Sequence, residues 1–173
     1  MIVTIFEDQD RKSLYPINQV RASFELRCGA FTNLERIQIS LNSNDEIQLF
    51  VRNEVKDLIQ ERYPHITVNP DSLSPGIWLN GQALWTKESI QQISSGRSFT
   101  CEERTLAIHN SETVSTSEVF NYMEEASAVS MEMDIPFIHH IWDSIFMQAE
   151  MITTDAQHFM DYQSGVIHPS VVL

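Results

Sequence analysis

The chain has 173 residues, of which 42% are apolar, and its formal net charge is −13 at pH 7. This length fits one ordinary domain, and this apolar fraction supplies a core, which excludes a disordered polymer. Nucleic acids and anionic membranes bind clustered positive charge, whereas the last 69 residues hold ten acids and no Lys or Arg. We therefore expect neither a nucleic acid nor a membrane as a partner.

The N-terminal sequence and the cysteines indicate a cytoplasmic protein. The first eight residues, MIVTIFED, lack the basic segment of a secretory signal, and no stretch approaches the ~20 consecutive apolar residues of a membrane span. Cys28 and Cys101 are too few for a disulfide framework and lack the CxxC spacing of a zinc site. We expect two reduced thiols, with Cys28 acting as a small buried apolar side chain.

The five glycines are too widely spaced for a GxGxxG or GxxxxGK[ST] motif, which excludes a Rossmann fingerprint and a Walker A loop. A phosphate site must therefore be built another way. Five of the 11 basic residues fall within the first 36 positions, namely Arg11, Lys12, Arg21, Arg27 and Arg36. Arginine offers a planar fork to phosphate oxygens, so an anionic ligand is expected here if these side chains converge.

Short β-rich apolar runs alternate with segments of helical spacing along the chain. In chain order, we predict a strand at 1–6, a loop at 8–13, a helix capped by Thr32 or Asn33, a strand at 47–51, a helix capped by Asn53, strands at 66–68 and 77–79, a helix at 87–93, a strand at 105–109, a helix from Thr116 or Ser117 to 123, a strand at 126–131 and a helix at 137–159. This alternation predicts an α/β fold, a three-layer sandwich with a mostly parallel sheet.

The C-terminal segment differs from the rest of the chain. Residues 164–173, SGVIHPSVVL, have the Gly, Val-Ile, Pro-Ser, Val-Val pattern of one rung of a hexapeptide-repeat β-helix, and a terminal strand would have the same pattern. We therefore divide the chain into an α/β domain, residues 1–163, and a second segment, residues 164–173. That segment is either the start of a truncated repeat domain or a terminal strand.

Several short motifs occur in a fixed order along nearly the whole chain. They are FED at 6–8, LYPI at 14–17, Arg21, FELRCG at 24–29, LERI at 34–37, IWLNG at 77–81 and IWD at 141–143. Together they resemble the N-terminal domain of bacterial sugar nucleotidyltransferases. The resemblance implies the nucleotide-diphospho-sugar-transferase fold, followed by a left-handed β-helix acyltransferase as in N-acetylglucosamine-1-phosphate uridyltransferase. A homo-oligomer would then form through that β-helix domain.

The resemblance also implies a reaction, in which a sugar-1-phosphate attacks the α-phosphate of a nucleoside triphosphate and pyrophosphate leaves. The partners are then a nucleoside triphosphate and a sugar phosphate, with Mg²⁺ as cofactor. We expect Arg21 and Arg27 to act as catalytic residues that hold phosphate oxygens, and Arg11, Asn80 and Gly81 to bind substrate. Alternatively, the arginines pair with nearby acids, namely Glu7, Asp8, Asp10 and Glu25, and hold the loop in place.

The chain departs from the active enzymes of this kind at two points. Acidic residues from Glu7 to Asp10 replace their glycine-rich segment, and Asn80 stands where they carry an aspartate that binds magnesium. A neutral amide is a poor ligand for that cation. Two hypotheses therefore stay open: a nucleotide-sugar-forming enzyme, or a catalytically inactive domain that positions or assembles an attached acyltransferase.

His139 and Asp143 would share one face of the predicted helix at 137–159, a spacing that can hold a metal ion. Two ligands do not make a metal site, and the sequence shows no third. We expect these side chains to pair with each other and predict no metal bound by protein ligands there.

Overall fold

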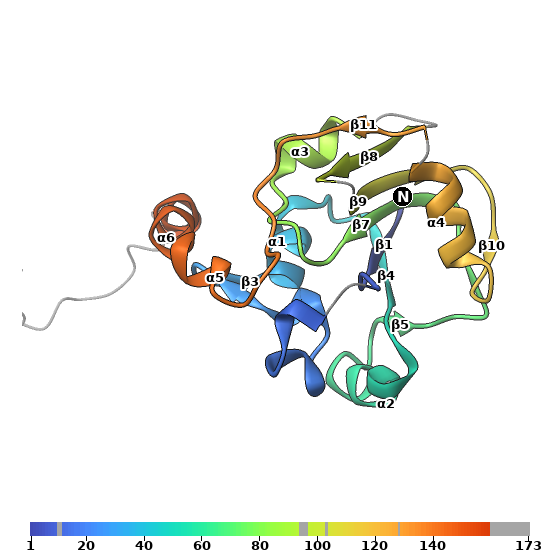
Figure 1. The fold of residues 1–173 in the computed structure, drawn as a ribbon, viewed down its shortest axis with the longest axis horizontal. Helices are drawn as coiled ribbons and strands as arrows, with labels where there is room; N and C mark the ends of the chain where they lie inside the picture. The colour runs from blue at the N-terminus through green and yellow to red at the C-terminus, as the bar shows by residue number, and fades with distance from the viewer. Residues whose placement is uncertain (10–11, 94–96, 103, 128, 160–173) are drawn as a thin grey trace, which may run out of the picture.

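The computed structural model describes residues 1–9, 12–93, 97–102, 104–127 and 129–159 (Figure 1). The strands of its central sheet are β1 (Ile2–Phe6), β4 (Glu46–Phe50), β5 (Thr67–Val68), β7 (Gly76–Asn80), β8 (Ser98–Cys101), β9 (Arg104–Asn110) and β11 (Met131–Glu132). Within these residues the seven strands are ordered β11-β8-β9-β7-β1-β4-β5. The pairs around β1 and β4 are parallel, as is β11 with β8, whereas β9 runs antiparallel to both neighbours. The predicted mostly parallel sheet is confirmed.

Helices cover both faces of this sheet. One face carries α1 (Asn33–Ser40), α2 (Asn53–Arg62) and α3 (Lys87–Gln91), and the other carries α4 (Val119–Ser127) with the small sheet of β6 (Ser72–Leu73) and β10 (Val114–Ser115). Strand alternation explains the two cores, because Ile77 and Leu79 pack in the first and Trp78 packs in the second. The predicted three-layer α/β architecture is therefore confirmed.

Helix α1 begins where the sequence predicts. Thr32 is its N-cap: the Thr32 hydroxyl accepts a hydrogen bond from the Glu35 amide at 3.2 Å, and the Glu35 carboxylate accepts one from the Thr32 amide at 2.7 Å. This reciprocal arrangement is a capping box. Helix α2 begins at Asn53, but its N-cap is Arg52, so the predicted Asn53 cap is wrong.

The predicted helix at 137–159 is wrong over its first part. Phe137 forms a β-bridge with Ala83, and the backbone of Ile138 exchanges hydrogen bonds with Gln82, at 3.0 Å to its carbonyl and 2.8 Å from its side-chain amide. These bonds use backbone groups that a helix would need. The helical part begins later and is divided into α5 (Asp143–Phe146), α6 (Gln148–Ala156) and the 3₁₀ turn η4 (Gln157–Phe159).

Other differences are smaller. Helix α4 extends through Ser127, so the strand predicted at 126–131 is reduced to the two residues of β11. Strand β8 is not predicted from the sequence, because its run, SFTC, is only four residues long and holds two apolar side chains. The segment after β1 forms three 3₁₀ turns, η1 (Lys12–Leu14), η2 (Ile17–Gln19) and η3 (Ser23–Glu25). The proposed repeat segment, residues 164–173, lies outside the described residues. None of the helices in the described parts has the length and apolar run needed to cross a bilayer.

The C-terminal helices pack beside the three layers, against a hairpin of β2 (Arg27–Cys28) and β3 (Phe31–Thr32) (Figure 1). A buried ion pair fastens α6 there: the Arg36 guanidinium binds both carboxylate oxygens of Asp155, which also accepts the Ala30 amide at 2.8 Å. Gly29 in the hairpin turn has φ +81°, and a Cβ at this position would lie 2.3 Å from Asp155 Oδ2. The glycine of the FELRCG motif is therefore required for α6 to approach the turn.

Replacing Asp155 with alanine should destabilise the protein by about 3–5 kcal/mol, because the substitution leaves the Arg36 guanidinium buried without a counter-charge. Urea denaturation followed by circular dichroism measures this loss. The matched control is Glu150→Ala, since Glu150 lies on the same helix but is exposed. Equal stability of the two variants would contradict a structural role for the Arg36–Asp155 pair.

Candidate functional site

The chain reverses its direction of travel across the sheet between β1 and β7. After β1 it continues to β4 and β5 on one side, and it then returns to place β7 on the other side of β1. The carboxyl ends of the two strands lie in register, with Phe6 paired to Asn80. In open α/β sheets, ligands bind outside the strand ends at such a switch point.

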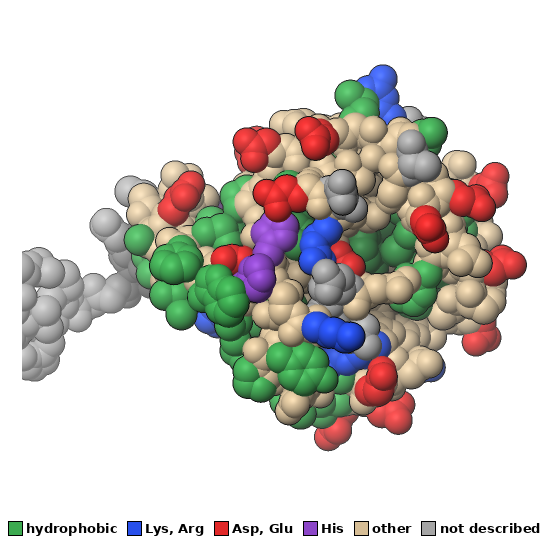
Figure 2. Space-filling view, viewed as in Figure 1, with side chains coloured by type: hydrophobic (Ala, Val, Ile, Leu, Met, Phe, Trp, Pro, Cys, Tyr) green, Lys and Arg blue, Asp and Glu red, His purple; other side chains and the backbone are tan. Residues whose placement is uncertain are grey.

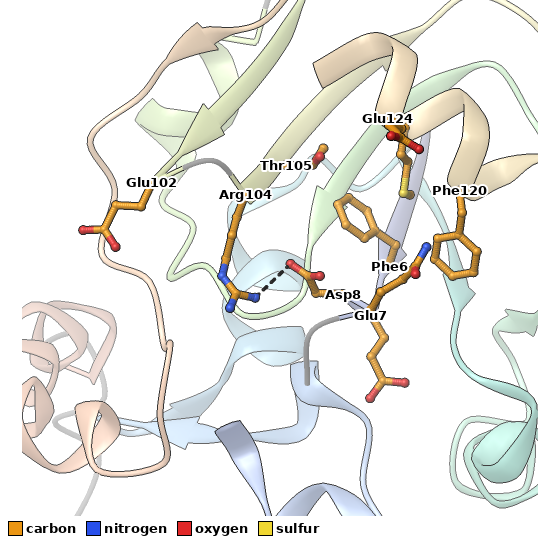
Figure 3. Close-up of a pocket in the computed structure, with 10 residues that line it drawn as sticks. Phe6, Glu7, Asp8, Glu102, Arg104, Thr105, Phe120 and Glu124 are labelled. Carbon is orange, nitrogen blue, oxygen red and sulfur yellow. Dashed lines mark hydrogen bonds and ion pairs between the residues drawn. The ribbon is translucent and has the colours of Figure 1, made fainter. Parts of the chain in front are cut away.

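A cavity of about 520 Å³ opens at this switch point (Figure 3). Its walls come from the segment that follows β1, from the start of β9 and from α4. Phe6, Phe120 and Met123 supply apolar surface, and the other lining residues are polar or charged: Glu7, Asp8, Gln9, Glu102, Arg104, Thr105 and Glu124. The combination of an apolar wall with polar groups is typical of a small-molecule site.

A second cavity of about 570 Å³ shares Glu102 and Arg104 with the first. It extends toward the segment at 137–147. Ser13 also lines it, and the residues from that segment are Phe137, His139, His140, Asp143, Phe146 and Met147. Figure 2 shows histidine side chains beside Lys and Arg side chains near the middle of this face, with acidic side chains distributed around its rim. Arg104 therefore lies where the two cavities meet.

Arg104 is held in a defined orientation at the start of β9. Its Nη1 lies 3.4 Å from Asp8 Oδ2, and its guanidinium carbon lies 5.9 Å from the centroid of the Phe137 ring. Asn80 Nδ2 donates to the same oxygen of Asp8 at 3.2 Å. Figure 3 shows Arg104 pointing toward Asp8, whereas Glu102 points away. A guanidinium fixed in this way between two cavities can bind phosphate oxygens.

Asn80 lies fully buried under the site, and its side chain is committed to the protein. Its Nδ2 donates to the Thr105 carbonyl at 2.8 Å as well as to Asp8, and its Oδ1 accepts the Gln82 amide at 2.9 Å. These contacts leave Asn80 ill-suited to hold magnesium. The described residues contain no group of three or more His, Cys, Asp or Glu side chains that could hold a metal ion.

The structure places Arg21 and Arg27 apart from this site. Neither lines the two cavities. Arg27 is exposed and forms an ion pair with Glu35 at 3.2 Å, and Arg21 is exposed, with its carbonyl accepting a bond from Arg52 at 3.3 Å. The described cavities therefore do not bring these two arginines together with Asn80. Arg11 lies outside the described residues.

Gly81 is a packing residue beneath the site. Its amide donates to the Phe6 carbonyl at 2.9 Å, and its carbonyl accepts the Asn33 side-chain amide at 2.8 Å. A Cβ at this position would lie 2.9 Å from the Cβ of Phe24, so the NG pair of the IWLNG motif allows close packing.

Two of the acids named as alternative partners for the nearby arginines, Glu7 and Glu25, pair with more distant arginines. Glu7 forms a buried ion pair with Arg52, and Glu25 accepts from Arg62 at 2.8 Å. Figure 3 shows the Glu7 side chain directed away from Arg104. The carboxylate of Glu7 is therefore neutralised inside the protein and does not face a bound anion directly.

The prediction that His139 pairs with Asp143 on one face of a helix is wrong, because residues 139 and 140 are not helical. His139 Nε2 lies 3.3 Å from Glu102 Oε2, and the His140 amide donates to Asp143 Oδ2 at 2.6 Å. Cys28 is fully buried, and this burial raises the pKa of its thiol, as expected for a structural cysteine.

Both the sequence and the fold are similar to those of known nucleotidyltransferases. The sequence profile of the sugar nucleotidyl transferase family matches residues 3–163, so the chain belongs to that family. One similar solved structure is a protein assigned as a glucose-1-phosphate thymidylyltransferase from Bacillus anthracis, in complex with sucrose: the identity is 10% and the TM-score 0.48, over 88% of this chain and 96% of that chain. The inositol-1-phosphate CTP transferase from T. maritima gives 12% identity and a TM-score of 0.38, over 84% and 80%. Comparison with curated proteins found no match.

Replacing Asn80 with aspartate should destabilise the protein by about 3 kcal/mol at pH 7, because the carboxylate oxygen that takes the place of Nδ2 would face Asp8 and the Thr105 carbonyl without a donor. Burial raises the pKa of such a carboxyl, so the deficit relative to wild type should shrink as the pH falls toward about 4. Urea denaturation at both pH values tests this. Asn53→Asp, on an exposed position at the start of α2, is the control and should cost almost nothing. A deficit that does not change with pH would contradict the buried-carboxylate explanation.

Proposed function

We propose that this domain binds a nucleoside triphosphate and a sugar-1-phosphate and joins them into a nucleotide sugar. An oxygen of the sugar phosphate attacks the α-phosphorus, the bond from that phosphorus to the pyrophosphate oxygen breaks, and pyrophosphate leaves. Family membership supports the reaction class. The position of Arg104 between two cavities at the switch point of the sheet is the observation that supports this site as the place of the reaction.

The chemistry of the two cavities suggests how the substrates would be oriented. The apolar wall of Phe6, Phe120 and Met123 suits a planar nucleobase. The second cavity offers the Ser13 hydroxyl and the Asp143 carboxylate, which suit a hydroxyl-rich sugar. Both volumes lie within the ~300–1,000 Å³ usual for small-molecule sites. The phosphates would then meet Arg104, where the cavities join.

Catalysis at such a site would depend on positioning and on stabilising charge, because nucleotidyl transfer requires little covalent help from the protein. Arg104 can place a fixed positive charge beside the reacting phosphates, and Asp8 orients it. Magnesium enters this proposal only as part of the substrate, the Mg²⁺–triphosphate complex, since the Asn80 side chain is already committed to the protein.

A second hypothesis is that the domain is catalytically inactive and positions or assembles an attached acyltransferase, as the sequence resemblance implies. Asn80 favours this alternative, because it replaces a magnesium-binding aspartate with a buried amide that supports Asp8. The two hypotheses differ in whether the cavities around Arg104 bind nucleotide and whether pyrophosphate is released.

Calorimetric titration of the four common nucleoside triphosphates and their nucleotide sugars, with and without Mg²⁺, tests the proposal. One of them should bind, and Arg104→Met should weaken that binding about tenfold or more, because a charge-assisted hydrogen bond to phosphate is lost. Arg97→Met is the matched control, since Arg97 is exposed and belongs to neither cavity. Arg21→Met and Arg27→Met in the same series test the arginine pair predicted from the sequence.

Pyrophosphate release with a panel of sugar-1-phosphates then separates the two hypotheses. Release that depends on Arg104 supports the enzyme. Binding that is lost in Arg21→Met and Arg27→Met but kept in Arg104→Met would move the phosphate site to the predicted arginine pair. The absence of both binding and release in the wild type would replace the enzyme with the inactive domain.

A further inference from the structure

His139 lies beside Arg104 at the second cavity and is a second hydrogen-bond donor there. The two side chains are 26% and 20% exposed, and both line the cavity. Both also pack on one aromatic ring: the Phe137 centroid lies 4.7 Å from the centroid of the His139 imidazole and 5.9 Å from the guanidinium carbon of Arg104. The two donors therefore lie close together on the wall of one cavity.

The backbone that carries His139 is held in place by other segments. Ile138 exchanges hydrogen bonds with Gln82, at 3.0 Å and 2.8 Å, and the His139 carbonyl accepts a hydrogen bond from the Ser13 hydroxyl. Arg104 is fixed by the carboxylate contact described above. Donors that are oriented before a ligand arrives bind it more tightly, because less freedom of motion is lost on binding.

The Glu102 carboxylate is the partner of His139 in this structure. Its Oε2 lies 3.3 Å from His139 Nε2, and the Glu102 side chain is 75% exposed. Figure 3 shows Glu102 pointing away from Arg104. An ion pair so exposed contributes little to stability, because water solvates its members almost as well. A phosphate group has more charge and more acceptor oxygens than this carboxylate, so it can replace the carboxylate on His139 at little cost.

The charges that line the second cavity favour an anion once Glu102 moves into solvent. The lining then holds one carboxylate, Asp143, against Arg104 and the imidazoles of His139 and His140. Asp143 already accepts the His140 amide at 2.6 Å. The carboxylate that orients Arg104 lines the first cavity and does not belong to the lining of the second.

We propose that Arg104 and His139 together bind the phosphate group of the sugar-1-phosphate, and that this phosphate displaces the Glu102 carboxylate from His139. The inference rests on the proposed function and adds to it the residue that positions the attacking group. Two donors from separate segments fix the orientation of one phosphate, so its attacking oxygen is directed toward the nucleotide in the first cavity. The second cavity thereby selects a phosphorylated sugar over an uncharged one.

The experiment uses the full chain with inorganic phosphate as the probe, followed by ¹H–¹⁵N NMR of the side chains. Phosphate should shift the imidazole signals of His139 and the guanidinium signal of Arg104 together. His139→Leu should weaken phosphate binding about fivefold, because a charge-assisted hydrogen bond is lost. His65→Leu is the matched control, since His65 is exposed and lines neither cavity.

Glu102→Gln should have the opposite effect and tighten phosphate binding about twofold to fivefold, because a competing negative charge is removed from His139. Glu61→Gln, at an exposed position on α2, is its control and should bind like wild type. If the contact between His139 and Glu102 were only structural, breaking it from either side would lower the melting temperature and weaken binding alike. The opposite signs therefore distinguish a phosphate site from a structural pair.

Phosphate affinity that is unchanged in His139→Leu, or weakened in Glu102→Gln, would overturn the proposal. Shifts at Arg104 without shifts at His139 would also overturn it. The triphosphate titrations separate this inference from the proposed function. A wild type that binds a triphosphate but shows no phosphate shift at His139 removes the inference and leaves the proposed function. Phosphate binding at both residues without any triphosphate binding leaves the phosphate site and removes the proposed function.

Discussion

The buried ion pair between Glu7 and Arg52 fixes the region on which the proposed active site depends. It joins the carboxyl end of β1 to the start of α2, just after β4, and β1 and β4 are parallel neighbours in the sheet. Glu7 also accepts the amides of Ser23 and Arg52, both at 3.3 Å, and Arg52 donates to the carbonyls of Asn18 and Arg21. The long connection after β1 is thereby held against the sheet. A buried pair so extensively hydrogen-bonded satisfies the charges that its burial would otherwise leave without water.

With Glu7 neutralised in this way, Asp8 is the next acid along the chain and lines the first cavity. The hydrogen bond from Asn80 to Asp8 couples the ends of β1 and β7, and Arg104 of β9 meets the same carboxylate oxygen. Side chains at the ends of three adjacent strands thus meet at the Asp8 carboxylate. This coupling explains why an amide at position 80 is compatible with the fold, since it donates to an acid that a second carboxylate would repel.

Acids exceed bases by 24 to 11 in this chain, and the arginines are used mainly to hold its own carboxylates. Arg36, Arg52 and Arg62 each bind an acid that is almost completely buried. In each case the partners are far apart in sequence. The pairs of Arg36 and Arg62 connect segments that the sheet alone would not join, whereas the pair of Arg52 reinforces the contact between the neighbouring strands β1 and β4. The C-terminal helices depend on such a pair, because the Arg36–Asp155 contact and the close approach at Gly29 hold α6 to the hairpin.

The sequence by itself determined the layered α/β architecture, because strand and helix periodicities reflect burial on one or two faces of each element. It also limited the N-cap of α1 to Thr32 or Asn33, of which Thr32 is the cap, and it predicted the buried state of Cys28. The tertiary structure decided which acid meets which arginine. One of the two alternatives from the sequence paired Glu7 and Glu25 with Arg11, Arg21 or Arg27, yet Arg52 and Arg62, at the two ends of α2, bind them.

The same reason explains why Arg104 was not predicted as a site residue. It follows Asp8 by 96 positions, and only the antiparallel placement of β9 beside β7 brings it to the switch point. The start of the predicted helix at 137–159 shows a related limit of local pattern: its apolar spacing suits a helix, but a β-bridge at Phe137 and hydrogen bonds between Gln82 and Ile138 prevent one there. Periodicity along the chain records how much each side chain is buried, whereas the partner of a charge or of a backbone amide is set by which segments the sheet brings together.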